Sequence, residues 1–358
     1  MIQNDWVSQS RQARPGWRGR MPRQTRRMKP ARVTTERGPG VFNNQPTSVY
    51  IVGAGAIGLY LGAHLSSIAN VTLVAREPRA SQLETDGFTL AGADTGHYRL
   101  PIQRVNSTLV LPPDALVLLA VKATDLEKLV GPLSHILHPG QAVGLLQNGL
   151  GVHKFVSTYL PHCRLVRITC WVGVNLHTPR EAVVAGAPLF ELGVDHPNCK
   201  DIEDNFLKLF NLANLRARVS GTVAEVEWRK ALLNLAVSGI CSLVDERNGA
   251  ILESPELREL VEQILEEALP VAHAEGVVLG ADDIERVFTA LHNTRHNWNA
   301  LLQDLRRGLD TEMPFLNAAV ERFAKRHKLD APVNGAIARL IAHVARRQSR
   351  TESLTRAH

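Results

Sequence analysis

The sequence predicts an α/β domain built on a largely parallel sheet, followed by an all-helical domain. Three observations lead to this fold class. Short, almost wholly apolar runs alternate with helical patterns in the first part of the chain, as in a parallel sheet that is covered on both faces. A glycine-rich turn joins the first apolar run to a helix. After about residue 220, helical periodicity dominates.

A β-α-β unit opens the predicted α/β domain. An apolar strand at residues 49–52 leads into the glycine turn, an amphipathic helix follows, and a second apolar strand occupies residues 71–75. The segment 88–102 alternates around a Gly/Asp turn and is predicted to be a hairpin inserted in the sheet. A helix is expected at 125–137. Further strands are predicted at 115–121, 142–146, 165–174 and 182–192, the last of which turns near 185–188.

Helices account for the rest of the ordered chain, beyond a boundary near residues 215–222. Ser254 is the expected N-cap of one of them, and Pro255 then falls in its first turn, where proline is tolerated. The predicted helices cover residues 223–243, 255–275, 283–291, 312–327 and 331–346.

The positive charge of the chain belongs to its N-terminal tail. The formal net charge is +6, yet residues 1–45 hold ten of the 41 Lys and Arg residues and two of the 35 acidic ones. This segment has no hydrophobic periodicity and is predicted to be disordered. It is interpreted first as an extension without function, upstream of a start at Met21 or Met28. An organelle transit peptide and a nucleic-acid-binding arm are the alternatives.

Composition excludes several other classes of protein. No apolar run approaches the roughly 18 residues that crossing a bilayer requires. The four cysteines, at positions 163, 170, 199 and 241, show neither CxxC pairing nor the spacing of metal ligands. We therefore expect reduced thiols, no metal site and a cytoplasmic protein.

The glycine turn, GAGAIG at residues 53–58, fits the GxGxxG motif in its proper context between a strand and a helix. The first glycine allows the tight turn, the second lets the backbone approach a pyrophosphate, and the third lets the helix pack on the strand. The pyrophosphate then sits at the positive end of the helix. The residues predicted to bind the dinucleotide are Gly53, Gly55, Ala56, Ile57 and Gly58.

The end of the second strand indicates which dinucleotide is bound. An NAD site normally places Asp or Glu there to bind the ribose 2′-hydroxyl, whereas this strand ends in Arg76. A guanidinium suits a 2′-phosphate, so NADPH is predicted. The other interpretation of Arg76 is a solvated surface arginine without a role in cofactor binding. The adjacent acidic residue Glu77 also counts against an NADPH site.

Polar residues also follow two later strands, where open α/β sheets bind ligands. Lys122 could contact the cofactor, and Asn148 could bond both the nicotinamide ribose and a substrate. On the helix at 223–243, Lys230, Asn234 and Ser238 are spaced i, i+4, i+8 and share one stripe. A proton donor beside a carbonyl oxygen and a hydride donor beside its carbon are what ketone reduction needs. Exposure of the stripe to water is the other interpretation.

These motifs together resemble the ketopantoate reductases (2-dehydropantoate 2-reductases) over residues 47–345. The resemblance rests on GAGAIG, Arg76, AVKATD, LLQNGLG, EWRKALLN and LLQDLRRGLDTEMPFLN, in this order and spacing. The glycine motif is shared by many enzymes, whereas the last two segments are far more specific to this family.

The resemblance implies a Rossmann domain, a helical domain akin to that of 6-phosphogluconate dehydrogenases, and a cleft between them. It also implies an NADP-dependent oxidoreductase that reduces 2-dehydropantoate to (R)-pantoate in pantothenate biosynthesis, on the coenzyme A pathway. Lys230 matches the general acid of the family, and Glu312 matches an acidic residue that positions the substrate and the lysine. Asn148 and Asn234 match amides that orient the substrate, and Lys122 matches a residue near the cofactor. As a first-turn helix residue, Glu312 is also explained by the helix dipole.

Two departures from the family pattern concern the substrate. The segment HNWNALLQD keeps Asn297, but Asn299 and Ala300 replace two serines, the second of which usually bonds the substrate carboxylate. Ser238 stands where asparagine is usual, and Trp298 either reshapes the pocket or only packs. A site with a missing polar partner discriminates differently between substrates. The predicted substrate-binding residues are Asn148, Asn234, Ser238, Asn297 and Ala300.

The resulting expectations divide the chain into four parts: a disordered basic tail (1–46), an NADP-binding Rossmann domain (47–220), a helical catalytic and substrate domain (221–348) and a flexible tail (349–358). Three alternatives to ketopantoate reduction stay open. They are a reductase of the same fold for another 2-keto acid, a non-catalytic NADPH-binding protein, and nucleic-acid binding through the basic tail. A homodimer is a candidate assembly.

Overall fold

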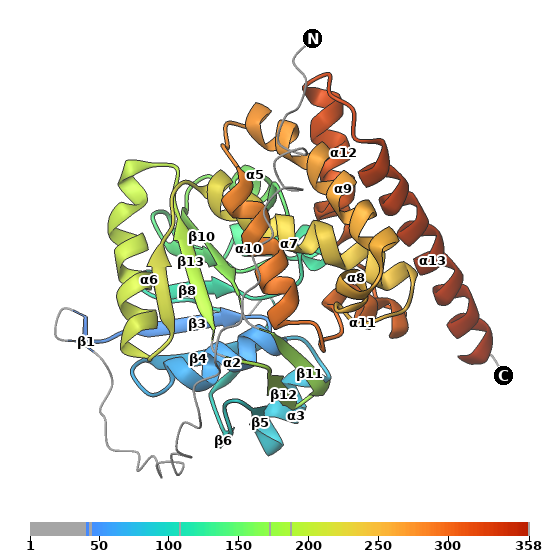
Figure 1. The fold of residues 1–358 in the computed structure, drawn as a ribbon. Helices are drawn as coiled ribbons and strands as arrows, with labels where there is room; N and C mark the ends of the chain where they lie inside the picture. Colours follow the sequence, from blue (N-terminus) through green and yellow to red (C-terminus); the bar gives the residue numbers. More distant parts are fainter. Residues whose placement is uncertain (1–40, 43–44, 107–108, 172, 187, 357–358) are drawn as a thin grey trace, which may run out of the picture. The chain divides into compact units, whose positions relative to one another are not determined.

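A computed structural model describes residues 41–42, 45–106, 109–171, 173–186 and 188–356. Most of the predicted basic tail therefore lies outside the described residues; at its end, the short strands β1 (Val41–Phe42) and β2 (Gln45–Pro46) pair antiparallel. The described chain consists of an α/β half followed by a helical half (Figure 1), which confirms the predicted fold class.

A single eight-stranded sheet forms the centre of the α/β half. Its strands are β3 (Ser48–Val52), β4 (Asn70–Ala75), β7 (Ile102–Arg104), β8 (Leu116–Leu119), β9 (Ala142–Leu145), β10 (Arg164–Cys170), β13 (Leu189–Gly193) and β14 (Arg216–Val219). They lie in the order β14-β13-β10-β9-β8-β3-β4-β7, and every neighbouring pair except β10 with β13 is parallel. The six strands from β3 to β10 thus follow the 3-2-1-4-5-6 order of the doubly wound dinucleotide-binding fold.

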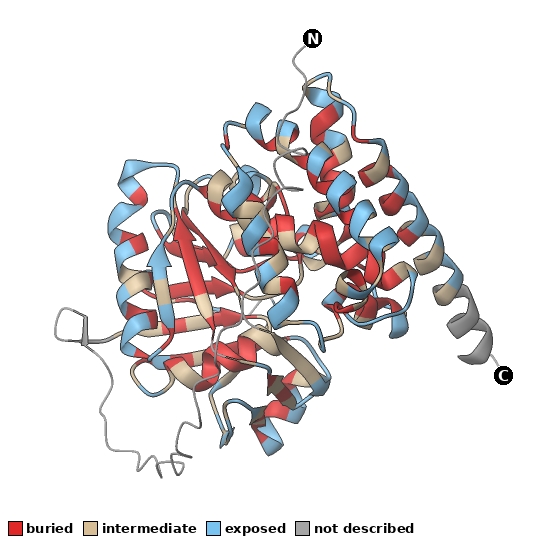
Figure 2. Cartoon of the chain, in the orientation of Figure 1, coloured by how far each residue is buried: buried red, intermediate tan, exposed pale blue. Residues whose placement is uncertain are grey.

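Helices cover both faces of this sheet, because its strands are apolar on both sides. They are α2 (Ala56–Leu65), α3 (Arg79–Asp86), α4 (Leu126–Ser134), α5 (Val152–Tyr159) and α6 (Lys200–Leu212). Leu129 of α4 and Val156 of α5 belong to the core on one face, whereas Leu61 of α2 and Phe206 of α6 belong to the core on the other. Figure 2 shows the result, with buried strands and helices exposed on their outer sides.

The predicted hairpin forms, but its placement in the main sheet was wrong. Strands β5 (Phe88–Gly92) and β6 (Gly96–Tyr98) join β11 (Val174–Thr178) and β12 (Glu181–Val184) in a second sheet of order β11-β12-β5-β6. This second sheet packs on α2. Helix α2, which the sequence predicted as amphipathic, is therefore buried at most of its positions, because its sequence AIGLYLGAHL is almost entirely apolar.

The helical half is organised around α7 (Val223–Leu243), which has its predicted bounds. A capping box between Thr222 and Glu225 sets its first turn. Helix α7 contacts β10 and β13 on one side and the other helices on the other, so it joins the two halves. The remaining helices are α8 (Ala250–Glu253), α9 (Pro255–Ala274), α10 (Ala281–Asn293), α11 (Ala300–Arg306), α12 (Asn317–Arg326) and α13 (Pro332–Arg356).

The observed ends of several helices can be compared with the predicted ones. The Ser254 side chain accepts a hydrogen bond from Leu257 N at 3.2 Å, which confirms it as an N-cap. The helix expected from residue 312 begins instead at Asn317, because Leu316 leaves the helical region at φ −112°, ψ −118°. Helix α13 continues to Arg356, through residues assigned to a flexible tail. None of the described helices is long and apolar enough to cross a membrane.

Candidate active site

The loop between β3 and α2 leaves its backbone open on one side. Gly53 has φ +115°, and a Cβ there would lie 2.7 Å from the backbone of Ala120. A Cβ at Gly58 would lie 1.9 Å from the carbonyl oxygen of Gly53, so only glycine lets the helix approach the strand this closely. At Gly55 the nearest atom to a Cβ would be 3.8 Å away. Gly53 and Gly58 therefore serve packing, whereas Gly55 leaves room for a ligand against its backbone.

The first turn of α2 offers donors to that ligand. Gly55 is the N-cap and no side chain caps the helix, and the first helical bond runs from Leu59 N to Gly55 O at 2.9 Å. The N–H groups of Ala56 and Ile57 precede this bond and have no partner within the helix. Free N–H groups at the positive end of a helix suit a pyrophosphate, so this loop fits a dinucleotide cofactor.

Arg76 lies at the tip of β4 as predicted, but it does not line the cavity described below. Its side chain is 62% exposed, and its Nη2 lies 3.1 Å from Oδ1 of Asp125. The neighbouring Glu77 is turned toward Arg104, whose Nε donates to its Oε1 at 2.6 Å.

Arg79, which the sequence analysis did not single out, is the arginine that contacts the glycine loop. Its Nη1 donates to the carbonyl oxygen of Ala54 at 2.6 Å. Burial lowers the pKa of its guanidinium, and the nearby charge of Arg307 lowers it further. The signal was its position, since Arg79 opens the helix that follows the strand tip.

A cavity of about 610 Å³ lies at the carboxyl ends of β3, β8 and β9 and extends to α7. Both halves of the described chain contribute to its wall. The predicted site residues on the wall are Gly55, Ala56, Ile57, Lys122, Asn148, Lys230, Asn234, Ser238, Asn297, Ala300 and Glu312. Gly53, Gly58 and Arg76 are the predicted residues that do not line it. The structure thus brings together groups as far apart in the chain as Gly55 and Glu312.

Glu312 ties the two strand-tip loops to the helical half. Its Oε1 accepts a hydrogen bond from the backbone N–H of Ala123, and its Oε2 accepts one from Nδ2 of Asn148, each at 3.2 Å. Lys122 forms an ion pair with Asp304 of α11 beside them. Burial raises the pKa of Glu312, and the two hydrogen bonds oppose that shift.

The polar stripe of α7 faces the cavity, which excludes the interpretation that it simply faces bulk water. Lys230 and Asn234 are half-buried on the wall, and Ser238 is buried there. Burial lowers the pKa of Lys230, and electrostatic interactions with Cys170, Glu191 and Glu312 oppose the shift. Helix α7 thus presents to the cavity a lysine whose ammonium is more acidic than that of an exposed lysine.

Trp171 and Asn248 are among the wall residues that were not predicted from the sequence. Trp171 directly follows β10, and the Lys230 ammonium lies 4.7 Å from the centroid of its indole ring. Asn248 is buried, and its backbone N–H donates to the carbonyl oxygen of Asn297 at 3.1 Å. For Trp171 the signal was its place at the carboxyl end of a strand, at the same sheet edge as Lys122 and Asn148.

The segment that departs from the family pattern begins α11. Asn299 is its N-cap, and its Oδ1 accepts bonds from Leu302 N at 2.9 Å and from the Ser242 hydroxyl at 3.3 Å. Asn299 therefore has a structural reason to replace serine. Ala300 is the first residue of the helix and offers the cavity a methyl group where a hydroxyl was expected.

Trp298 both lines the cavity and packs. The guanidinium Cζ atoms of Arg247 and Arg306 lie over its ring, 5.2 Å and 4.1 Å from the centroid. Trp298 is therefore a packing residue that also forms part of the cavity wall.

Both halves of the chain that form this cavity match a known protein family. Residues 49–195 match the family described as ketopantoate reductase PanE/ApbA, and residues 222–345 match the C-terminal part of the same family. A 2-dehydropantoate 2-reductase of Pyrococcus abyssi is 27% identical over 290 residues, covering 80% of this chain and 94% of that protein. One of Streptococcus pyogenes is 28% identical over 298 residues, covering 82% and 96%.

Solved structures share the fold. A D-mandelate dehydrogenase in complex with NADH and anilino(oxo)acetate superposes with a TM-score of 0.78 at 20% identity, covering 84% of this chain and 99% of that one. A PanE/ApbA family ketopantoate reductase from Ralstonia eutropha JMP134 gives 0.77 at 23% identity, with the same coverage. A dimeric ketopantoate reductase from Staphylococcus aureus gives 0.70 at 18% identity, again covering 84% and 99%.

The two family matches lie on either side of the α7 start, so together they span the glycine loop, the strand tips and the helical wall of one cavity. The chain is an oxidoreductase that belongs to the ketopantoate reductase family.

Proposed function

We propose that this protein reduces 2-dehydropantoate to (R)-pantoate with NADPH. The observation that carries the proposal is the convergence of Lys230, Asn148 and Glu312 on one cavity that also opens onto the backbone of Gly55. The names of the sequence relatives favour 2-dehydropantoate over another 2-keto acid. Residues 47–220 would then hold the cofactor, and residues 221–348 would supply the catalytic groups.

The glycine loop and the strand tips fit the cofactor. The N–H groups of the first α2 turn would bind the pyrophosphate, and Arg76 and Arg79 would provide positive charge beside the adenosine ribose. Asp125 pairs with Arg76, so Arg79 supports the preference for a 2′-phosphate more directly. When bound, NADPH would supply the hydride for C2 of the keto acid.

Lys230 would donate the proton that the carbonyl oxygen takes up during reduction. Its burial makes the ammonium a stronger acid than an exposed lysine, which favours proton transfer near neutral pH. Glu312 would hold Asn148 and the backbone at Ala123 in place, and Asn148 and Asn234 would orient the keto acid. Each of these groups thereby acts on position or on the proton, and none accepts the hydride.

The carboxylate of the substrate would lie near the start of α11. Ala300 cannot hydrogen-bond it, so Asn297 and Ser238 are the polar side chains of the predicted set that remain on that part of the wall. We expect Ala300→Ser to lower the KM for 2-dehydropantoate while kcat changes little, because the added hydroxyl binds the ground state and the transition state alike.

The test uses the purified full chain with 2-dehydropantoate and either NADPH or NADH, followed by the absorbance of the reduced nicotinamide and by chiral analysis of the pantoate. Lys230→Ala should lower kcat by about 10²–10⁴-fold with little change in NADPH affinity. Lys128→Ala, on the exposed side of α4, is the matched control. Absence of turnover by the wild-type chain would overturn the proposal.

Arg79→Ala should weaken binding of NADPH but not of NADH, since a guanidinium on the 2′-phosphate has no partner in NADH. Arg258→Ala, on the surface of α9, provides the comparison. A homodimer stays a prediction, and sedimentation of the full chain would test it.

A further inference from the structure

The environment of the Lys230 ammonium is unusual for a buried charge. Nζ lies over the indole ring of Trp171, 4.7 Å from its centroid, and within the described part of the chain the lysine forms no ion pair. The faces of aromatic rings attract cations, and tryptophan does so most strongly. The indole ring of Trp171 therefore stabilises the ammonium charge at close range.

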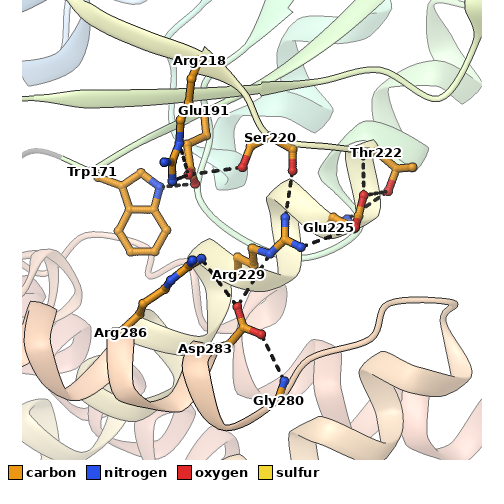
Figure 3. A network of polar contacts seen from close by, with 10 residues as sticks. All are labelled: Trp171, Glu191, Arg218, Ser220, Thr222, Glu225, Arg229, Gly280, Asp283 and Arg286. Carbon is orange, nitrogen blue, oxygen red and sulfur yellow. Dashed lines mark hydrogen bonds and ion pairs between the residues drawn. The ribbon is translucent and has the colours of Figure 1, made fainter.

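The orientation of the Trp171 ring is fixed by a hydrogen bond from its indole N–H. Its Nε1 donates to Oε2 of Glu191 at 2.7 Å (Figure 3). The other oxygen of this buried carboxylate accepts bonds from Nε of Arg218 at 3.0 Å and from the Ser220 hydroxyl at 3.3 Å. Strands β13 and β14 supply these partners, so the ring orientation is set by the sheet and not by the helix that carries Lys230.

This arrangement differs from a direct salt bridge in one respect that matters for proton transfer. A carboxylate in contact with Lys230 would accept its proton in a hydrogen bond and draw the ammonium away from a substrate. A ring face stabilises the cation without accepting a proton. Because the indole N–H donates to the Glu191 carboxylate, the ring also becomes richer in electrons, so the negative charge acts on Lys230 through the indole.

We propose that Trp171, anchored by Glu191, is a positioning residue that keeps the Lys230 ammonium protonated and directed into the cavity. The proposal rests on the proposed role of Lys230 as the proton donor. It adds a tuning element that lies outside the set of residues predicted from the sequence.

Other groups near Lys230 also affect its pKa, and their effect has to be distinguished from that of the indole ring. Cys170 on β10, Glu191 on β13 and Glu312 across the cavity all raise the pKa of the lysine against its burial. Lys122 and Asp304 lie near Glu312.

On the side of α7 that packs on α10, Arg229 is engaged by Glu225 and Asp283, and Arg286 also lies near Asp283 (Figure 3). Within this cluster the positive charges of the two arginines are balanced by the two carboxylates. The ring contact is the interaction that a single substitution removes without changing any formal charge.

The experiment measures the protonation of Lys230 directly in the full chain. Acetic anhydride labels the amine form, and mass spectrometry of the peptide that contains Lys230 gives the labelling rate at each pH. Trp171→Leu should move the midpoint to lower pH by about one unit, since a desolvated cation–π contact changes the ratio of ammonium to amine by about tenfold. Trp171→Phe should shift it less, because phenylalanine keeps a ring.

Two further variants make the test specific. Glu191→Gln should shift the midpoint in the same direction, because it removes the charge behind the indole. Trp298→Phe is the matched control, since Trp298 lies on the same cavity but stacks on Arg306 at 4.1 Å. It should leave the midpoint where it is in the wild-type chain.

Turnover gives the second readout. In Trp171→Leu the basic limb of kcat/KM against pH should move by the same amount as the labelling midpoint, with NADPH affinity unchanged. Equal midpoints in the wild type, Trp171→Leu and Glu191→Gln would overturn the proposal, and so would an equal shift in Trp298→Phe. If the wild-type chain does not reduce 2-dehydropantoate, the proposed function fails, whereas the labelling still decides the role of Trp171.

Discussion

At the scale of single residues, the cavity wall holds two half-buried ionisable groups, Lys230 and Glu312, whose pKa values move in opposite directions. Burial disfavours the charged form of both, so it lowers the pKa of Lys230 and raises that of Glu312. Strongly shifted pKa values in a cleft are typical of functional sites, and a lowered lysine pKa brings a potential proton donor closer to neutrality. They also give the reaction a definite dependence on pH.

We predict a bell-shaped profile of kcat/KM for keto-acid reduction. Reduction needs protonated Lys230, so activity falls as pH rises through the lowered pKa of Lys230. The ionised form of Glu312 is the one that best accepts bonds from Ala123 and Asn148, so activity falls again as pH drops through its raised pKa. Steady-state rates across pH, with each buffer checked for enzyme stability, measure both limbs.

Glu312→Gln separates the two limbs. The amide cannot ionise in this range, so the acidic limb should disappear while the basic limb stays. An acidic limb that persists in this variant would assign it to another group.

At the scale of elements, the glycine loop depends on close contact between β3 and α2. The Cβ of Gly58→Ala would lie 1.9 Å from the Gly53 carbonyl oxygen, so the helix has to move away from the strand. We expect a loss of stability on the order of 1–3 kcal/mol together with weaker NADPH binding. Urea unfolding and fluorescence titration with NADPH measure the two effects.

Gly131 in α4 is the control for this prediction. A Cβ there meets nothing within 4 Å, so Gly131→Ala should stabilise the chain by about 0.5–1 kcal/mol through helix propensity and leave NADPH binding unchanged. If both variants bind NADPH as the wild type does, the close packing of the loop is not needed for the cofactor.

At the scale of the whole described molecule, a buried ion pair joins the two halves. Arg167 of β10 and Glu227 of α7 are 1% and 7% exposed, and Nε of the arginine lies 2.9 Å from Oε1 of the glutamate. Glu227 also accepts bonds from the backbone N–H groups of Gly151 at 2.8 Å and of His153 at 3.1 Å. The pair therefore fixes α7, which carries Lys230, Asn234 and Ser238, against the loop that follows Asn148.

Glu227→Ala should lower the free energy of unfolding by about 3–5 kcal/mol, because it leaves the buried guanidinium without its counter-charge. Glu262→Ala removes a partner of the exposed Arg258 on α9 and should cost about 0–1 kcal/mol. Denaturant unfolding of both variants, compared at one pH, measures the difference. Similar losses in the two variants would mean that the buried pair does not hold the halves together.

Much of the fold was predictable because it depends on local patterns. Apolar runs of strand length and the turn at Gly53 predicted the β-α-β unit, and helical periodicity predicted the bounds of α7. Helix α6 was missed, although Ile202, Phe206 and Phe210 recur at helical spacing and are buried. The place of the hairpin at 88–102 was not predictable, because strands join a sheet through partners that are distant in sequence.

The sequence by itself determined the family, the glycine loop and the set Lys230, Asn234 and Glu312, because each is carried by contiguous residues with fixed spacing. Only the tertiary structure decided which residues these groups and the arginines of the loop contact. It paired Arg76 with Asp125, brought Arg79 onto the glycine loop, and set Trp171 under the Lys230 ammonium. Such contacts join residues from different strands and helices, and the burial that shifts their pKa values exists only once those elements have packed.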